Sequence, residues 1–289
     1  MEITMTMIGE GIYLINIILA MIIIFRQRRD IVAIWAWLLG LFLLPVIGFL
    51  SYAFLGRQLP KDKLFKAKSD VQLQLNDLLA KQRKALGGES LPADEASDSV
   101  KSLVTMFQTA NHAFLARKNR VRIIADGKQL FHAMIEDIER AHDSVHVEFY
   151  SFYNDAIGKQ IRDLLVRKAR SGVEVRVIYD PFGSFGAFHS FFKPLIAAGG
   201  YAEPFLTRSA LTDFRLNFRD HRKIVVVDGK VGYVGGFNIG DQYLGRHKKF
   251  GYWRDTHLRV VGSAVFGLQG RFILDWNATA SKGLLPADH

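Results

Sequence analysis

The residues best suited to chemistry are three polar side chains grouped around one short apolar run. His221 and Lys223 stand two residues apart, just before four β-branched residues at 224–227, and Asn238 follows a glycine pair further on. The run predicts a buried strand, in which side chains alternate, so His221 and Lys223 point to the same face. An imidazole, an ammonium and an amide that converge on one space suit a phosphate, with a nucleophile or base and two groups that offset its charge.

The spacing of the whole segment is more specific than any of its parts. Asp228 and Gly229 are typical of a two-residue hairpin, which predicts a second strand at 231–234. Gly235 and Gly236 then allow a close approach of the backbone. The pattern is His-x-Lys, four residues, Asp, six residues and Gly-Gly-x-Asn, and it resembles the HKD motif of the phospholipase D superfamily.

The resemblance covers most of the chain, from about residue 35 to residue 276. Over this length the sequence is similar to bacterial cardiolipin synthases of the phospholipase D type. The matching stretches are Pro-x-x-Gly, Tyr and Gly-Arg within 45–57, Arg-x-Asn-x-Arg at 215–219, Gly-Asp-x-Tyr-Leu at 240–244, Tyr-Trp-Arg-Asp-Thr-His at 252–257 and Phe-x-x-Asp-Trp at 272–276. One departure is Asp220, where Asn is expected next to the histidine.

The resemblance assigns roles to individual residues. It implies that His221 is the nucleophile, which we favour, or the general acid, in a reaction that passes through a phosphohistidine. Lys223 and Asn238 would neutralise the phosphoryl oxygens, and Asp255 would hold the imidazole in one tautomer. The predicted catalytic set is completed by Asp228, which we expect to tie the hairpin more than to act in chemistry. The residues predicted to border the substrate are Glu148, Arg219, Gly235 and Gly236.

The family implies a reaction and its partners. The expected function is a membrane-bound phosphatidyl transferase that makes cardiolipin from two phosphatidylglycerols, with no cofactor. No metal is expected, because the chain has no spaced ligand cluster and lysine supplies positive charge. Family enzymes carry two HKD motifs facing each other, and this chain has one, so the second half-site is expected from a second copy or from a missing C-terminal half. The other histidine segments, at 247–249 and 257–259 among them, lack the pattern.

Composition narrows the possible partners. The 289 residues include no cysteine, which excludes disulfides, thiolate metal sites and a cysteine nucleophile. The net charge of +10 lies almost wholly beyond residue 57 and suits lipid head groups or nucleic acid. The apolar N-terminus favours lipid over nucleic acid. Two alternatives stay open: a homodimeric phosphodiesterase or nuclease, and an inactive membrane-anchored fragment.

The N-terminal region predicts a membrane hairpin over residues 1–57. Two apolar runs, 7–25 and 31–55, are each close to the length that crosses a bilayer, with a kink expected at Pro45. A signal peptide is the weaker interpretation of the first run, because no Lys or Arg precedes it. We therefore expect a multi-pass protein of the cell membrane. Basic residues lie both in the hairpin loop and after the second run, so the sequence does not decide on which side of the membrane the catalytic domain lies.

The remainder predicts a connecting segment and one α/β domain. Residues 58–99 contain an expected basic helix at 63–86 and a linker. Residues 100–289 alternate strand and helix patterns, which predicts an α/β fold of the phospholipase D type, with a mixed or mostly parallel sheet flanked by helices. The expected strands are 121–125, 144–152, 173–179, 224–227, 231–234 and 253–261, and the expected helices are 129–141, 157–169, 188–198 and 264–276.

Overall fold

The chain forms two compact units, one of residues 1–64 with 209–218, the other of residues 65–208 with 219–289. The computed structural model describes residues 2–26, 31–55, 97–110, 113, 115–187, 189–205, 219–246 and 249–280. The predicted helix at 63–86 and the matching residues Arg215 and Asn217 lie outside the described residues.

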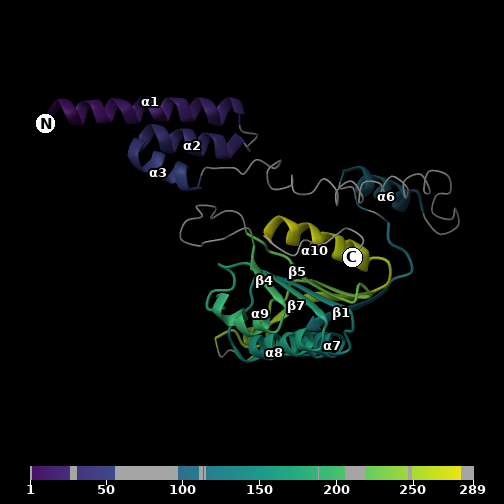
Figure 1. Cartoon of the computed structure of the whole chain (residues 1–289). Helices are drawn as coiled ribbons and strands as arrows, with labels where there is room; N and C mark the ends of the chain where they lie inside the picture. The colour runs from purple at the N-terminus through teal and green to yellow at the C-terminus, as the bar shows by residue number, and fades with distance from the viewer. Residues whose placement is uncertain are drawn as a thin grey trace. The chain divides into compact units, whose positions relative to one another are not determined.

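The described residues of the first unit form three helices where the sequence predicts two (Figure 1). They are α1 (Glu2–Arg26), α2 (Ile31–Leu43) and α3 (Pro45–Leu55). The kink predicted at Pro45 is a full break at Leu44, and α3 packs back against α2. Gly48 permits this packing, because a Cβ there would overlap the carbonyl group of Gly40.

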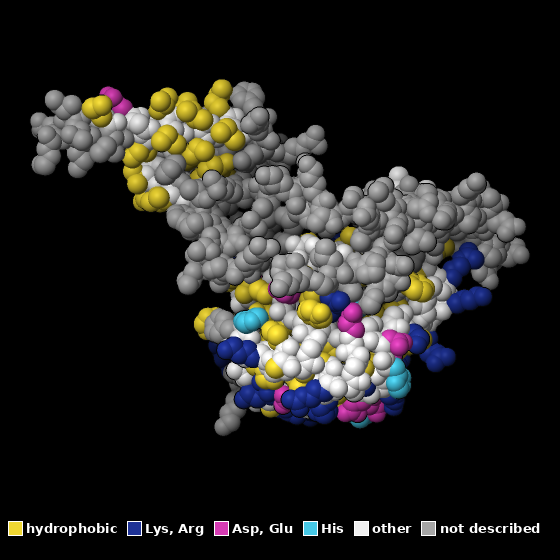
Figure 2. Space-filling view, in the orientation of Figure 1, with side chains coloured by type: hydrophobic (Ala, Val, Ile, Leu, Met, Phe, Trp, Pro, Cys, Tyr) yellow, Lys and Arg dark blue, Asp and Glu magenta, His cyan; other side chains and the backbone are white. Residues whose placement is uncertain are grey.

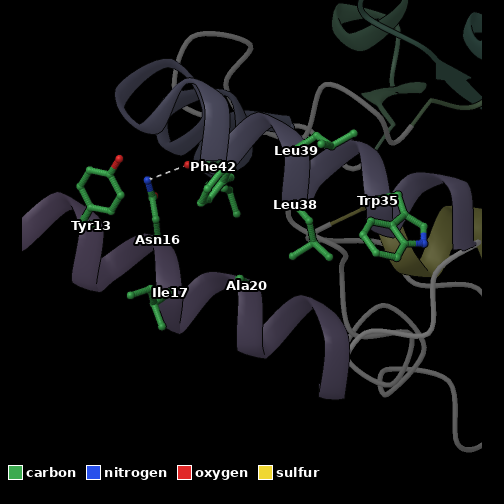
Figure 3. A pocket seen from close by; sticks show the side chains of 9 residues that line it. Tyr13, Asn16, Ile17, Ala20, Trp35, Leu38, Leu39 and Phe42 are labelled. Carbon is green, nitrogen blue, oxygen red and sulfur yellow. Dashed lines mark hydrogen bonds between the residues drawn. The ribbon is translucent and has the colours of Figure 1, made fainter.

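Asn16 stabilises the break from the neighbouring helix (Figure 3). Proline has no N–H, so the Leu41 carbonyl loses its helical donor at Pro45. The Asn16 amide nitrogen replaces that donor, 3.2 Å from the Leu41 oxygen and 3.0 Å from the Pro45 oxygen. Beside it, α1 and α2 enclose an apolar cavity of about 340 Å³.

The break changes the predicted membrane hairpin. The α2 and α3 helices have 13 and 11 residues, or about 20 and 16 Å, against a hydrocarbon core of about 30 Å. Within the described ranges, no helix combines the length and apolarity needed to cross a bilayer. That two helices span the membrane stays a prediction. The surface of this unit is nevertheless strongly apolar (Figure 2), with Leu14, Ile18, Phe42 and Ile47 among its exposed side chains.

The second unit is built on one seven-stranded sheet with the order β1-β7-β6-β5-β2-β3-β4. The strands are β1 (Arg120–Asp126), β2 (Ser144–Phe149), β3 (Glu174–Tyr179), β4 (Tyr201–Pro204), β5 (Lys223–Val227), β6 (Val231–Gly235) and β7 (Arg254–Val261). The helices are α6 (Asp98–Ala110), α7 (Gly127–Glu139), α8 (Ala156–Arg170), η2 (His189–Phe192), α9 (Lys193–Ala197), η3 (Asp241–Leu244) and α10 (Val265–Thr279).

Helices cover both faces of the sheet (Figure 1). The α7, α8 and α9 helices pack on one face, where Phe149, Val225 and Tyr233 belong to the largest core cluster. The α10 helix covers the other face and packs its Phe272 and Trp276 against Ile178. The β5 strand is therefore buried on both sides, as the uniform run at 224–227 predicts.

The predicted α/β class is confirmed, and the sheet is mixed. The β2, β3 and β4 strands pair in parallel, whereas the β1–β7, β7–β6, β6–β5 and β5–β2 pairs are antiparallel. The β5–β6 pair is antiparallel because the hairpin at Asp228 and Gly229 returns the chain directly beside β5. The positive φ angles of both residues, 50° and 60°, fit this tight turn.

Candidate active site

His221 and Lys223 lie at the start of β5, in the middle of the sheet. Register pairs Lys223 with Phe149, the last residue of β2, so both face the α7 and α8 side. The His221 side chain is exposed and Lys223 is 3% exposed. The predicted alternation therefore places an accessible imidazole next to a largely buried ammonium.

Tyr150, which the sequence analysis did not select, joins these two groups. Its ring centroid lies 4.8 Å from that of His221, and the Lys223 Nζ lies 5.2 Å from the same ring. The Tyr150 N–H also donates to the Arg222 carbonyl oxygen at 3.0 Å. The Tyr150 ring therefore packs against the imidazole of His221 and presents its π face to the Lys223 ammonium. The only sequence signal for this residue is its place directly after the β2 strand.

The Lys223 ammonium is held close to the backbone of the candidate nucleophile. Nζ donates to the His221 carbonyl oxygen at 2.7 Å. Burial lowers the pKa of Lys223 to about 8, and the carboxylates of Asp220 and Asp255 oppose that shift. The side chain stays mostly protonated at neutral pH and has further N–H donors for an anion.

Asn238 is bonded into the fold and keeps one donor. Its Oδ1 accepts the Ser151 N–H at 3.0 Å, and its Nδ2 donates to the Tyr243 hydroxyl at 2.9 Å. These bonds tie the segment after β6 to the end of β2, close to Tyr150. A primary amide has two N–H donors, so the second has no partner among the described residues and can donate to an anion.

The glycine pair makes room for β7. A Cβ on Gly235 would lie 2.5 Å from the His257 Cα, and a Cβ on Gly236 would overlap the Asp255 carboxylate. The expected close approach therefore exists, and its partner is the neighbouring strand. It allows Asp255 to lie beside Gly236, where its Oδ1 accepts the Thr256 N–H at 2.7 Å. No hydrogen bond joins Asp255 to the His221 ring among the described residues.

His257 is a buried histidine beside the same site. Its side chain is fully buried, and neither ring nitrogen has a hydrogen-bond partner among the described residues. Burial lowers its pKa to about 4, with the Lys223 charge adding to the effect and Asp255 opposing it. The imidazole is therefore neutral at physiological pH. The sequence gives it a structural role, since it lacks the His-x-Lys pattern.

Asp228 lies at the opposite end of β5. Its carboxylate accepts the N–H groups of His142, Asp143 and Ser144 at 3.0, 2.8 and 2.9 Å. Burial opposes ionisation, but these three donors outweigh it and hold the pKa of Asp228 below its usual value. The residue ties the β5–β6 turn to the start of β2, and it does not join the group around His221.

The other two predicted substrate-border residues are Glu148 and Arg219. Glu148 pairs with Ile224 and so faces α10, on the opposite side of the sheet from Lys223. The Arg219 guanidinium stacks 3.6 Å from the ring centroid of Phe182. The residues brought together are therefore His221, Lys223 and Tyr150, with Asn238, Asp255 and His257 around them.

The family models match both units. Residues 134–251 match the model described as "Cardiolipin synthase, PLD-like domain", and residues 14–57 match "Phospholipase_D-nuclease N-terminal". The chain carries the phospholipase D-like domain of cardiolipin synthases. The resemblance predicted from the motif and its flanking segments is thereby confirmed.

Relatives support the same family assignment. The "Major cardiolipin synthase ClsA" of Bacillus subtilis (strain 168) is 45% identical over 267 residues, or 92% of this chain and 55% of that protein. A "Cardiolipin synthase" of Staphylococcus aureus (strain Mu50) is 44% identical over 280 residues, or 96% and 57%. The chain thus spans little more than half the length of these cardiolipin synthases.

Among solved structures, NucT from Helicobacter pylori covers 56% of this chain and 99% of its own, at 14% identity and a TM-score of 0.43. The phosphatidylserine synthase of Haemophilus influenzae covers 54% of this chain and 36% of its own, at 18% identity and a TM-score of 0.43. Similarity at this level supports no functional inference.

Proposed function

We propose that this chain supplies one half-site of a phosphatidyl transferase that forms cardiolipin and glycerol from two phosphatidylglycerols. The observation that carries the proposal is the exposed imidazole of His221 on the same face as the Lys223 ammonium, with Tyr150 against both. The assignment of the domain to the cardiolipin synthase family supports the substrate class.

The first step is attack on phosphorus by a neutral ring nitrogen of His221. A P–N bond forms and the P–O bond to one glycerol breaks, and that glycerol oxygen takes a proton from a general acid. We assign the acid to the second half-site, from another copy of the chain or a C-terminal half. Lys223 and the free amide donor of Asn238 stabilise the charge that builds on the phosphoryl oxygens.

The second step reverses the first with a new alcohol. A hydroxyl of the second phosphatidylglycerol loses its proton to the same acid–base group and attacks phosphorus. A P–O bond forms, the P–N bond breaks and His221 is regenerated. Because both lipids stay in a bilayer, we propose that the apolar surface of the α1–α3 unit holds the chain at the membrane.

The test is conversion of labelled phosphatidylglycerol by the purified full-length chain in mixed micelles, with the molar mass measured in the same sample. We expect His221→Ala to abolish both cardiolipin formation and the phosphorylated protein intermediate. His132→Ala is the matched control, because His132 is an exposed histidine on α7, and it should retain full activity.

The same samples separate the alternatives. Retained cardiolipin formation in His221→Ala would refute the assignment of the nucleophile. Salt-sensitive cleavage of DNA without lipid turnover would favour the nuclease interpretation. A strictly monomeric chain with no activity on either substrate would favour a fragment that needs its missing half.

A further inference from the structure

Two carboxyl groups, those of Glu148 and Asp220, meet on the α10 side of the sheet, behind His221. Both side chains are fully buried, and the Arg222 Nη1 lies 3.2 Å from Asp220 and 3.8 Å from Glu148, which brings the two carboxyl groups close together. Both Glu148 oxygens and the Asp220 Oδ2 lack a donor among the described residues. Two buried acceptors can face each other stably only if one of them carries a proton.

The charges around the pair favour that proton. The Arg222 Nη1 lies 3.2 Å from both Asp220 and Asp275 and 3.8 Å from Glu148, and Arg271 on α10 pairs with Asp275. On the remaining side the Asp180 carboxylate accepts the Asp220 N–H at 3.1 Å. Among the described residues, two guanidinium groups thus face four carboxyl groups. Burial, reinforced by Asp275 and Asp220, raises the pKa of Glu148 well above its usual value.

Hydrogen bonds connect Asp220 and its surroundings to the backbone of residues 220 and 222, which flank His221. The Asp220 Oδ1 accepts the N–H of Arg222 at 3.0 Å and its Nη1 at 3.2 Å. The Asp220 N–H is held by Asp180. Since side chains alternate, residues 220 and 222 face α10 while His221 and Lys223 face the opposite side. An anchor behind the sheet therefore sets the position of the imidazole in front of it.

We propose that Glu148 and Asp220 are positioning residues that share one proton and thereby hold the backbone on either side of His221. The inference rests on the proposed role of His221 and not on the identity of its substrate. Loss of the shared proton would leave two buried carboxylates in contact, and their repulsion would displace this segment. An Asn at position 220 would supply an N–H donor in place of the shared proton, so it should preserve the link at every pH.

The first test needs no substrate. The unfolding midpoint of the full-length chain in detergent is measured across about pH 5 to 9 for wild type, Asp220→Asn and Glu148→Gln. A carboxyl group with a raised pKa keeps in the folded state a proton that the unfolded chain releases. The contribution of the pair to stability therefore falls with rising pH, so the wild-type curve should decline relative to those of the amide variants, with a slope difference of up to about one proton. Both amide variants should lack this contribution, and an unchanged slope in both would overturn the shared proton.

The second test asks whether the pair positions His221. The ring signal of His221, labelled with ¹³C and assigned through His221→Ala, is followed by NMR through the same pH range. We expect the ring signal to shift as the pair loses its proton in wild type, and this shift to be absent in Asp220→Asn. An identical titration in both proteins would refute the positioning role.

Activity provides a third readout with a conservative rescue. At neutral pH, Asp220→Asn and Glu148→Gln should stay within about threefold of wild type, while Glu148→Leu should lose about 100-fold, as a misplaced group does. Equal damage in Glu148→Gln and Glu148→Leu would contradict the proposal. If a dimeric wild-type chain makes no cardiolipin, the proposed function fails, while the unfolding and NMR measurements still decide the role of the pair.

Discussion

The ammonium nitrogen of Lys223 lies 2.7 Å from the backbone carbonyl oxygen of His221. This bond orients a cation along the edge where the His221 ring is exposed, and it uses one of three N–H donors. Because the rest of the side chain is buried, the charge is poorly solvated, which lowers the pKa of Lys223 to about 8. An anion that approaches the imidazole would restore that solvation, so the arrangement favours phosphate binding before any chemistry occurs.

The pH dependence of activity should reveal Lys223. Its ammonium is present below pH 8 and lost above it, so kcat/KM should fall as the pH rises through about 8. Lys223→Gln should lose about 100- to 1000-fold in kcat at neutral pH, as other charge-stabilising groups do. Lys223→Arg, whose group stays protonated, should move the fall to higher pH. A fall at the same pH in wild type and Lys223→Arg would assign it to another group.

Asp228 should be important for stability and not for chemistry. Asp228→Ala removes three charge-assisted backbone hydrogen bonds and places alanine at a φ of 50°. We expect a loss of about 2–4 kcal/mol in the free energy of unfolding. Asp228→Asn should lose less, because Asn tolerates this backbone and keeps an acceptor. The measurement is denaturant unfolding together with activity per folded molecule. A stable but inactive Asp228→Ala would contradict the structural role.

The sequence predicts the site well where one local rule decides the geometry. Alternation along a strand places His221 and Lys223 on one face, and the Asp228-Gly229 turn fixes β6 beside β5. Both rules act within a few residues, so they hold without knowledge of the rest of the chain.

Residues that meet only through the sheet order could not be predicted. Tyr150 reaches His221 because β2 pairs with β5, and Glu148 faces away for the same reason. The two residues are two apart and would share a face if β2 continued, so the end of the strand at Phe149 separates Tyr150, which lies at the site, from Glu148. In the first unit, the break before Pro45 depends on Asn16 from another helix, which no pattern within residues 31–55 contains.

Gly236 should affect activity through Asp255. Gly236→Ala adds a Cβ that overlaps the Asp255 carboxylate, which must then move. We expect a loss of about tenfold or more in kcat if that carboxylate assists the His221 ring. A double-mutant cycle with Asp255→Ala is the control. Gly236→Ala should have little further effect in that background, and an equally large effect there would show that the glycine acts on another group.

Gly48 and Gly40 form a matched pair for the fold of the first unit. A Cβ on Gly40 meets open space, whereas a Cβ on Gly48 would overlap the Gly40 carbonyl group. Gly40→Ala should therefore be neutral or stabilise α2 by about 0.5–1 kcal/mol. Gly48→Ala should force α3 away from α2 and lower the unfolding midpoint in detergent. Equal midpoints for the two variants would refute the close packing at this break.

His257 should make the fold sensitive to mild acid. Its pKa is about 4 in the folded chain and about 6.5 when unfolded. As the pH falls through this window, the unfolded chain takes up a proton that the folded chain does not, so stability present above pH 6.5 is lost by at most about 3 kcal/mol. Asp228, whose pKa is lowered, affects stability only when the pH falls below about 4, the ordinary pKa of a carboxyl group. Its effect is therefore separate from that of His257.

His257→Leu should abolish the loss of stability between about pH 6.5 and 4, measured as the unfolding midpoint at each pH. A parallel loss in wild type and His257→Leu would assign the loss to another group.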